Sequence, residues 1–271
     1  MSAPAESVMA WEPLTPRGVA AFAAARLSRL LLVQFVVASL AAIVVVRFLS
    51  DSCFPVMREA IQQLPESGAI RSGRLDVPDD SPRLLAGGRF LAFVIDPGHS
   101  GQIQSSADVQ IEFGRETGRV NSLFGYAEWN YPSDWIIALN RTELEPLWGA
   151  WEPEWLAITV LSVVAGLMVS WAMLATIYFL PAALFGFLMN RRLNLPGSWK
   201  LSGAALLPGA LLFTAAIVAY DFGVIDLIQF CFFFGAHFVL GWIYLVLSQF
   251  FLPWIDARPS GVNPFAPPPI H

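Results

Sequence analysis

The last apolar stretch of the chain carries polar residues whose spacing could support chemistry inside a membrane. Within residues 224–250, Asp226, His237 and Tyr244 follow one another at intervals that return to nearly the same angle around a helix, and Phe233 shares their face. Ionisable groups at membrane depth usually face a bundle interior or a water-filled cavity, where they mark proton or substrate paths. The spacing therefore predicts a candidate intramembrane polar face formed by these three residues.

A structural interpretation fits the same residues. Asp226 can lie at the outer interface, while His237 hydrogen-bonds a neighbouring helix. Away from their ends, the other predicted spans carry no charged partner, which a coupled transporter would need for its relay. Both interpretations stay open: the structural role comes first, and a proton or substrate path through this face is the alternative.

A second candidate is the segment Val94-Ile95-Asp96-Pro97-Gly98-His99. It resembles the Asp-x-Gly-His signature of zinc-dependent N-acetylmuramoyl-alanine amidases, in which the histidine binds zinc. Catalytic zinc needs three protein ligands, however, and the chain's other histidines are His237, in a predicted span, and His271, at the far end. We therefore expect a type II turn that joins two strands, with Pro97 and Gly98 at its central positions, and we predict no catalytic residue, no cofactor and no metal site.

The composition of the chain indicates a membrane protein. Apolar residues make up 56% of the 271 positions and charged residues only 14%, far from the balance of a soluble domain. Apolar runs of about 20 residues can cross a bilayer. We predict four spans, at residues 23–49, 155–180, 201–220 and 224–250, with the second helix ending near Phe179 because Pro181 follows. Two cysteines, Cys53 and Cys231, are too few for a disulfide framework.

Residues 50–154 differ from the rest of the chain in being acidic and water-compatible. A short helix is expected from Phe54 to Leu64, strands at 90–95 and 109–113, a turn at 114–118 and a return strand at 120–129. This pattern predicts a small α+β, β-rich domain. Its excess of carboxylates over arginines argues against nucleic acid as a partner. The three tryptophans expected at the lipid–water boundary are Trp148, Trp151 and Trp155.

Basic residues set the expected orientation. They form two clusters, which four spans place on one side of the membrane, and the positive-inside rule makes that side cytoplasmic. These topology determinants are Arg17, Arg26, Arg29, Arg191, Arg192 and Lys200. We therefore expect both termini inside, the β-rich domain outside, and cytoplasmic tails at residues 1–22 (disordered) and 253–271 (Pro-rich). A cleaved signal peptide or a lipoprotein at Cys53 is the disfavoured alternative to a retained anchor.

Short motifs add a family resemblance. Leu64-Pro65 through Ser72-Gly73-Arg74-Leu75, together with Phe93-Val94-Ile95-Asp96-Pro97-Gly98, resemble an uncharacterised bacterial membrane family, domain of unknown function 1189. The spans, with Ser202-Gly203 before Pro208, are similar to Yip-like helical bundles. The resemblance implies an anchor, an exported β-rich domain and a closing bundle, but no catalytic residues.

These features together predict a multi-pass α-helical protein of the bacterial cytoplasmic (inner) membrane, with four spans and both termini inside. We expect a non-enzymatic accessory, scaffold or binding protein of the cell envelope. Its expected partners are the lipid bilayer and another envelope or membrane protein. The alternatives are a small transporter or flippase-like subunit that uses the polar face of the fourth span and, with least support, a wall hydrolase centred on His99.

Overall fold

The computed structural model describes residues 11–255, which form two compact units. Among these residues, unit 1 comprises 11–40, 164–215 and 231–255, and unit 2 comprises 41–163 and 216–230. Unit 1 is helical, whereas unit 2 contains the strands.

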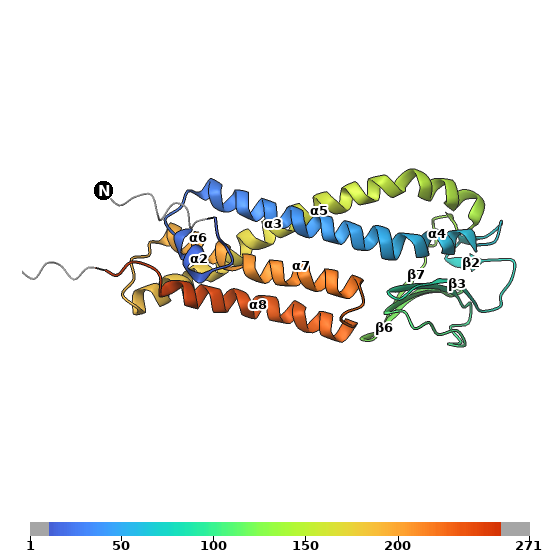
Figure 1. Ribbon diagram of the computed structural model, residues 1–271. Helices are drawn as coiled ribbons and strands as arrows, with labels where there is room; N and C mark the ends of the chain where they lie inside the picture. Colours follow the sequence, from blue (N-terminus) through green and yellow to red (C-terminus); the bar gives the residue numbers. More distant parts are fainter. Residues whose placement is uncertain (1–10, 256–271) are drawn as a thin grey trace, which may run out of the picture. The chain divides into compact units, whose positions relative to one another are not determined.

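Within residues 11–255, four helical segments are long and apolar enough to cross a membrane (Figure 1). The first joins α3 (Leu27–Phe48), a π-helical turn η1 (Leu49–Cys53) and α4 (Phe54–Gln62), and the second is α5 (Arg141–Leu188). The third joins α6 (Leu195–Ala205) and α7 (Leu207–Asp221), and the fourth is α8 (Leu227–Gln249). The expected combination of four long apolar helices with a small β-rich region is thus present.

Helix α5 differs from the expected second span at both ends. It begins at Arg141 because Asn140 caps it: the Asn140 side chain accepts a hydrogen bond from the Glu143 N–H at 2.9 Å and donates one to the Glu143 carboxylate at 3.3 Å. The expected end near Phe179 is wrong, because the helix continues through Pro181 to Leu188. A helix that ended at Phe179 would leave the carbonyl groups of its last turn without partners, whereas continuation past Pro181 leaves only the carbonyl that proline cannot pair.

The third and fourth spans also begin at different residues from those expected. Residues 195–200, which precede the expected third span at 201–220, form the first turns of α6, because the Asn194 side chain accepts a hydrogen bond from the Gly197 N–H at 2.7 Å. A break at Leu206 separates α6 from α7. The fourth helix starts at Leu227 rather than residue 224.

The two ends of the described chain are structured where tails were expected. Residues 16–21 form helix α2 (Pro16–Ala21), and the side chains of Val19 and Phe22 are fully buried in the core of unit 1. At the other end, the carbonyl of Pro253 accepts a hydrogen bond from the Arg192 N–H at 2.8 Å. Apolar burial and strand-like pairing therefore fix both segments. The remainder of the predicted tails, residues 1–10 and 256–271, lies outside the described residues.

Two buried glutamines join helices within unit 1. Gln34 of α3 donates to the Gly203 carbonyl of α6 at 3.3 Å, and Gln249 of α8 donates to the Ala182 carbonyl of α5 at 3.3 Å. Both side chains are at most 3% exposed. Hydrogen bonds of this kind hold helices together where apolar surroundings provide no hydrophobic driving force between them.

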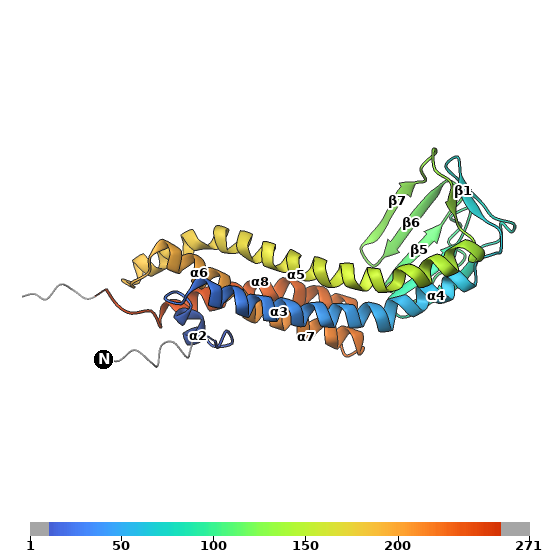
Figure 2. The same ribbon diagram turned by 90° about the horizontal axis from the view of Figure 1, so that it is seen from above.

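Unit 2 contains two sheets. The smaller has the order β2-β1-β8, formed by β1 (Ala69–Arg71), β2 (Arg74–Asp76) and β8 (Ile137–Ala138). The larger has the order β3-β4-β5-β6-β7, and its strands are β3 (Arg83–Gly87), β4 (Leu91–Ile95), β5 (Val109–Phe113), β6 (Thr117–Ser122) and β7 (Gly125–Asn130). Figure 2 shows β5, β6 and β7 side by side. The core of unit 2 gathers apolar side chains from α4 and both sheets.

The expected strands at 90–95 and 109–113 are confirmed by β4 and β5, and the expected helix from Phe54 by α4. The expected return strand is present as β6, which pairs antiparallel with β5, but it does not run through residues 120–129. That segment is two antiparallel strands, β6 and β7, which turn at Leu123 and Phe124. Neither residue is a turn former, so the composition of the segment concealed the turn.

The Asp96–His99 segment is a β-turn, since the His99 N–H donates to the Asp96 carbonyl at 3.0 Å. It is not type II, because that turn requires a positive φ at Gly98 and the positive value (48°) lies at His99 instead. The turn does not lead into a hairpin either, because β4 and β5 run parallel. Parallel neighbours need a crossover, which residues 96–108 supply.

Candidate functional site

Strand β5 buries its polar side chains and leaves its apolar ones half-exposed. Gln110 and Glu112 are 8% and 4% exposed, whereas Ile111 between them is half-buried. The crossover segment covers the polar face: the Gln110 amide accepts from the Ser105 N–H at 2.9 Å and donates to the Ile103 carbonyl at 3.4 Å. The alternating pattern was read correctly as a strand, but its polar side faces the protein.

His99 lies at the centre of this polar face. Its Nδ1 makes a short hydrogen bond with the Glu112 carboxylate, and its Nε2 lies 2.9 Å from the Thr117 hydroxyl. The other Glu112 oxygen accepts from the Asn121 amide at 3.1 Å. Because the His99 and Glu112 side chains are only 16% and 5% exposed, the cluster is largely screened from water.

The direction of the next hydrogen bond determines what His99 can do. The Thr117 hydroxyl donates to Glu128 at 2.7 Å, and this bond holds the pKa of the Glu128 carboxyl below its ordinary value. An ionised carboxylate only accepts hydrogen bonds. The hydroxyl proton is therefore committed to Glu128, so Thr117 accepts from His99 Nε2–H, and His99 Nδ1 and the Glu112 carboxyl share one proton between them.

The resulting order of hydroxyl, imidazole and carboxylate resembles the arrangement of a nucleophile, a base and an orienting acid. A general base must offer a free lone pair to the nucleophile's proton. Here both ring nitrogens of His99 already have protein partners, and the Thr117 proton already has an acceptor. The geometry therefore corresponds to a clasp that fastens the crossover segment to β5, β6 and β7. We call residues His99, Glu112, Thr117, Asn121 and Glu128 the His99 clasp.

The backbone around the clasp is shaped to fit the ring. A Cβ placed on Gly114 would lie 2.2 Å from His99 Nε2, so only glycine leaves room for the imidazole there. Asp96, which is 1% exposed, fixes the turn that carries His99: its carboxylate accepts from the Ser100 hydroxyl at 2.9 Å and the Gly101 N–H at 3.0 Å. Burial raises the pKa of the Asp96 carboxyl, but these hydrogen bonds outweigh it and leave the pKa below its ordinary value.

No group of three or more His, Cys, Asp or Glu side chains that could hold a metal ion occurs within residues 11–255. The amidase-like interpretation would need His99 as a ligand, yet both of its ring nitrogens already have protein partners. His271 lies outside the described residues.

The structure gives each member of the predicted polar face a separate partner. Asp226 is exposed and caps α8, with its carboxylate accepting from the Gln229 N–H at 2.8 Å while its own N–H donates to the Gln229 side chain at 3.0 Å. This reciprocal pair is a capping box. Helix capping therefore accounts for Asp226, the first residue of the predicted polar face.

The other two members lie further along α8. His237 bonds the Phe234 carbonyl through Nδ1, and its ring stacks on Phe213 with the centroids 5.3 Å apart. The Tyr244 hydroxyl donates to the Leu14 carbonyl at 2.6 Å. These contacts do not connect the three residues into a relay.

The basic residues predicted to set topology come together in unit 1. Lys200 donates to the Ala25 carbonyl at 2.6 Å, beside Arg26, so the two clusters meet at this point. Arg191 is only 8% exposed: it donates to the Leu252 carbonyl at 2.7 Å and lies 3.7 Å from the ring centroid of Trp254. Arg29 lies over the Trp11 ring at 5.1 Å. Arg191 and Lys200 are thus structural as well as basic.

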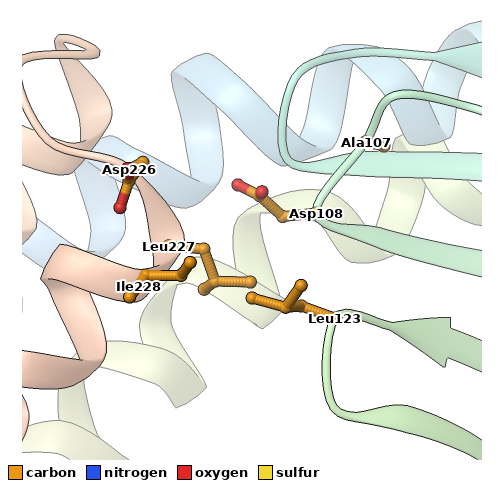
Figure 3. Close-up of a pocket in the computed structure, with 6 residues that line it drawn as sticks. All are labelled: Ala107, Asp108, Leu123, Asp226, Leu227 and Ile228. Carbon is orange, nitrogen blue, oxygen red and sulfur yellow. The ribbon is translucent and has the colours of Figure 1, made fainter.

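A cavity in unit 2 was not predicted from the sequence. It has a volume of about 320 Å³, and the lining residues are Ala107, Asp108, Leu123, Asp226, Leu227 and Ile228. Figure 3 shows the side chains of Leu123 and Leu227 pointing toward one another, with Asp108 above them. The β6–β7 turn and the first turn of α8 therefore line one cavity.

Polar contacts hold the α7–α8 connection against the sheet beside this cavity. The Tyr220 hydroxyl makes a short hydrogen bond to Asp108, and Arg89 donates to the Ile225 carbonyl at 2.9 Å. A Cβ on Gly223 would meet the Arg89 guanidinium at 2.0 Å, so the arginine lies directly over this glycine. Sequence reasoning missed Arg89, Asp108 and Tyr220 because they are distant in the chain and form no motif.

Comparisons of the chain with protein-family models, curated proteins and solved structures find no match.

Proposed function

We propose that this chain is a four-span protein of the bacterial cytoplasmic membrane whose β-rich region, outside the cell membrane, binds an extended segment of another envelope protein. The single observation that carries the binding proposal is β7. It is an edge strand, all six of its residues are exposed, and it contains no proline, lysine or arginine. An edge strand presents unpaired backbone groups that a further strand can use.

The opposite edge of the same sheet is protected. Strand β3 changes register between Leu84 and Ala86, and helix α4 packs against it. The β6–β7 pairing, by contrast, continues without a shift from Thr117↔Asn130 to Ser122↔Gly125. Bulges and covering helices are the usual means of preventing strand addition. Their presence on β3 and their absence from β7 favour β7 as the binding edge.

The side chains of β7 favour an extended occupant with some basic character. Tyr126 and Trp129 project to opposite faces of the sheet, Tyr126 over Arg119 at 4.8 Å and Trp129 against Gly118. An added strand would find an exposed ring on each face. Residues 51–154 contain sixteen carboxylates against eight arginines, so a basic segment is favoured electrostatically.

Membrane placement is supported by the outward side chains of α5. A soluble protein rarely exposes a long row of apolar side chains. The following six are each more than half exposed: Leu161, Val169, Met173, Ile177, Leu180 and Leu184. The third segment, α6 with α7, has 61% of its apolar window buried, against 6% for α5. This difference in burial is expected for a helical bundle in which α6 and α7 lie in the interior and α5 faces lipid. The junction of the two basic clusters at Lys200 and Ala25 supports a shared, cytoplasmic side for them.

The binding proposal is tested with photo-crosslinking amino acids in the full chain in native membranes. We expect probes at Tyr126 and Trp129 to give an adduct of one mass, and a probe at Leu84 on the protected edge to give none. Successive N–H groups along an edge strand alternate between the neighbour and the open side. Of the adjacent residues Ala127 and Glu128, one therefore has its N–H directed to β6 and the other has its N–H directed to the open side. Proline at the residue whose N–H faces the open side keeps the β6–β7 pairing and should abolish the adduct. Adducts that survive both proline variants, or that form equally at Leu84, would exclude strand addition at β7.

Three contacts already described leave the transport alternative without support from the geometry. Asp226 caps α8, His237 bonds its own helix, and Tyr244 bonds the Leu14 carbonyl. Transport along this face stays a prediction from the sequence.

A further inference from the structure

The turn between β6 and β7 exposes two large apolar side chains that its backbone does not require. Leu123 is 59% exposed and Phe124 is 73% exposed. The turn depends on Gly125, whose φ is +115°, and on Ser122, whose hydroxyl accepts from the Phe124 N–H at 3.3 Å. Two-residue hairpin turns favour Asn, Asp and Gly at their centre. Leucine and phenylalanine there point to something that the turn contacts.

The surroundings of the turn indicate what that contact is. Leu123 lines the same cavity as Leu227 and Ile228, which form the first turn of the fourth candidate span. Ile228 is itself 64% exposed, and Val224 in the preceding connection is 75% exposed. The turn thus lies beside the end of an apolar helix, where a bilayer surface would be.

The charge pattern fits lipid better than water. Residues 120–127 carry no charge, and Tyr126, 67% exposed, adds an amphipathic ring near the turn. Aromatic and aliphatic side chains favour the membrane–water interface, whereas charged ones are excluded from its apolar depth.

We propose that the Leu123–Phe124 turn inserts into the lipid leaflet at the start of α8 and so anchors the β-rich region to the bilayer surface. This inference rests on the proposed membrane placement. It adds a contact with lipid that the four spans do not provide, and it would hold the β6–β7 hairpin, including the β7 edge, close to the membrane.

The test uses the full chain with Cys53→Ser and Cys231→Ala, carrying one fluorescently labelled cysteine, in phosphatidylcholine–phosphatidylglycerol vesicles. The probe is placed by Phe124→Cys, and the matched control is Ser72→Cys in the exposed β1–β2 turn. Burying the Leu123 side chain, which this variant keeps, favours the inserted state about tenfold or more, so aqueous iodide should quench the probe at residue 124 about tenfold less than the probe at residue 72. A nitroxide attached to the lipid headgroups should quench the probe at residue 124 and leave the probe at residue 72 unquenched.

A third label, by Val239→Cys on an exposed position of α8, separates the two proposals. One outcome is that a nitroxide at the centre of the acyl chains quenches the probe at residue 239 while the probes at residues 124 and 72 are quenched equally by iodide. In that case the turn does not insert, and only the further inference fails. If 239 is not quenched, membrane placement itself fails. Shielding of 124 that appears only as the protein-to-lipid ratio rises would mean that a second copy covers the turn, which also overturns the inference.

Discussion

Replacing His99 with asparagine is expected to destabilise the β-rich region by about 1–3 kcal/mol, the usual cost of leaving a buried hydrogen-bonding group without its partner. Glu112 is 4% exposed and would keep only the Asn121 amide as a partner. Asparagine suits the test because it tolerates a positive φ, which His99 adopts at 48°. The loss therefore reports the imidazole and not backbone strain. The measurement is the urea midpoint for proteolysis of residues 51–154 in the full chain in mild detergent.

A double variant supplies the control for the His99 clasp. Adding Glu112→Gln to His99→Asn replaces the buried carboxyl group with a neutral amide, so part of the lost stability should return. A purely additive loss would show that the two side chains do not act together. If His99→Asn alone changes stability by less than about 0.5 kcal/mol, as an ordinary surface substitution does, the clasp does not hold the crossover segment.

The second large effect is expected at Gly209 in α7. A Cβ there would lie 2.3 Å from the His237 carbonyl oxygen of α8, a backbone atom that cannot rotate away. Small residues allow membrane helices to approach closely. Gly209→Ala should therefore destabilise unit 1 by about 1–3 kcal/mol, as overpacking does. Thermal unfolding of the purified chain in detergent measures the change.

Gly235 in α8 provides the matched control, because nothing lies within 4 Å of the Cβ that alanine would add. Gly235→Ala should leave the melting temperature unchanged or raise it, since alanine favours helix over glycine by up to about 1 kcal/mol. Equal effects at the two glycines would mean that α7 and α8 are not in close contact at Gly209.

Much of the architecture follows from periodicity. Long apolar runs predict the four helices, and the Val109–Phe113 alternation predicts β5, because both signals depend on local composition. Helix ends were less predictable. Asn140 and Asn194 extend their helices by capping, and α5 continues past Pro181 because ending there would leave the carbonyl groups of its last turn without partners.

Little of the candidate site could be predicted from the sequence. His99 was noticed, but Glu112 sits on a strand whose alternation indicated that its polar face was solvated. A nine-residue segment, 99–107, covers that face instead, and its path depends on β4 and β5 being parallel. Parallel pairing, unlike strand identity, leaves no local signal. The cavity beside Leu123 escaped prediction for the same reason, because its walls are about 100 residues apart in the chain.

The central claim is that four helices place the β-rich region outside the membrane and the basic clusters inside. Labelling of single cysteines with a membrane-impermeant maleimide in intact cells tests it most directly, in the background Cys53→Ser and Cys231→Ala. Both positions chosen, Ser81 between β2 and β3 and Leu195 at the start of α6, are exposed, and neither substitution removes a basic residue. We expect Ser81→Cys to be labelled at once and Leu195→Cys to be labelled only after the cells are permeabilised. Immediate labelling at residue 195 with protection at residue 81 would contradict this topology.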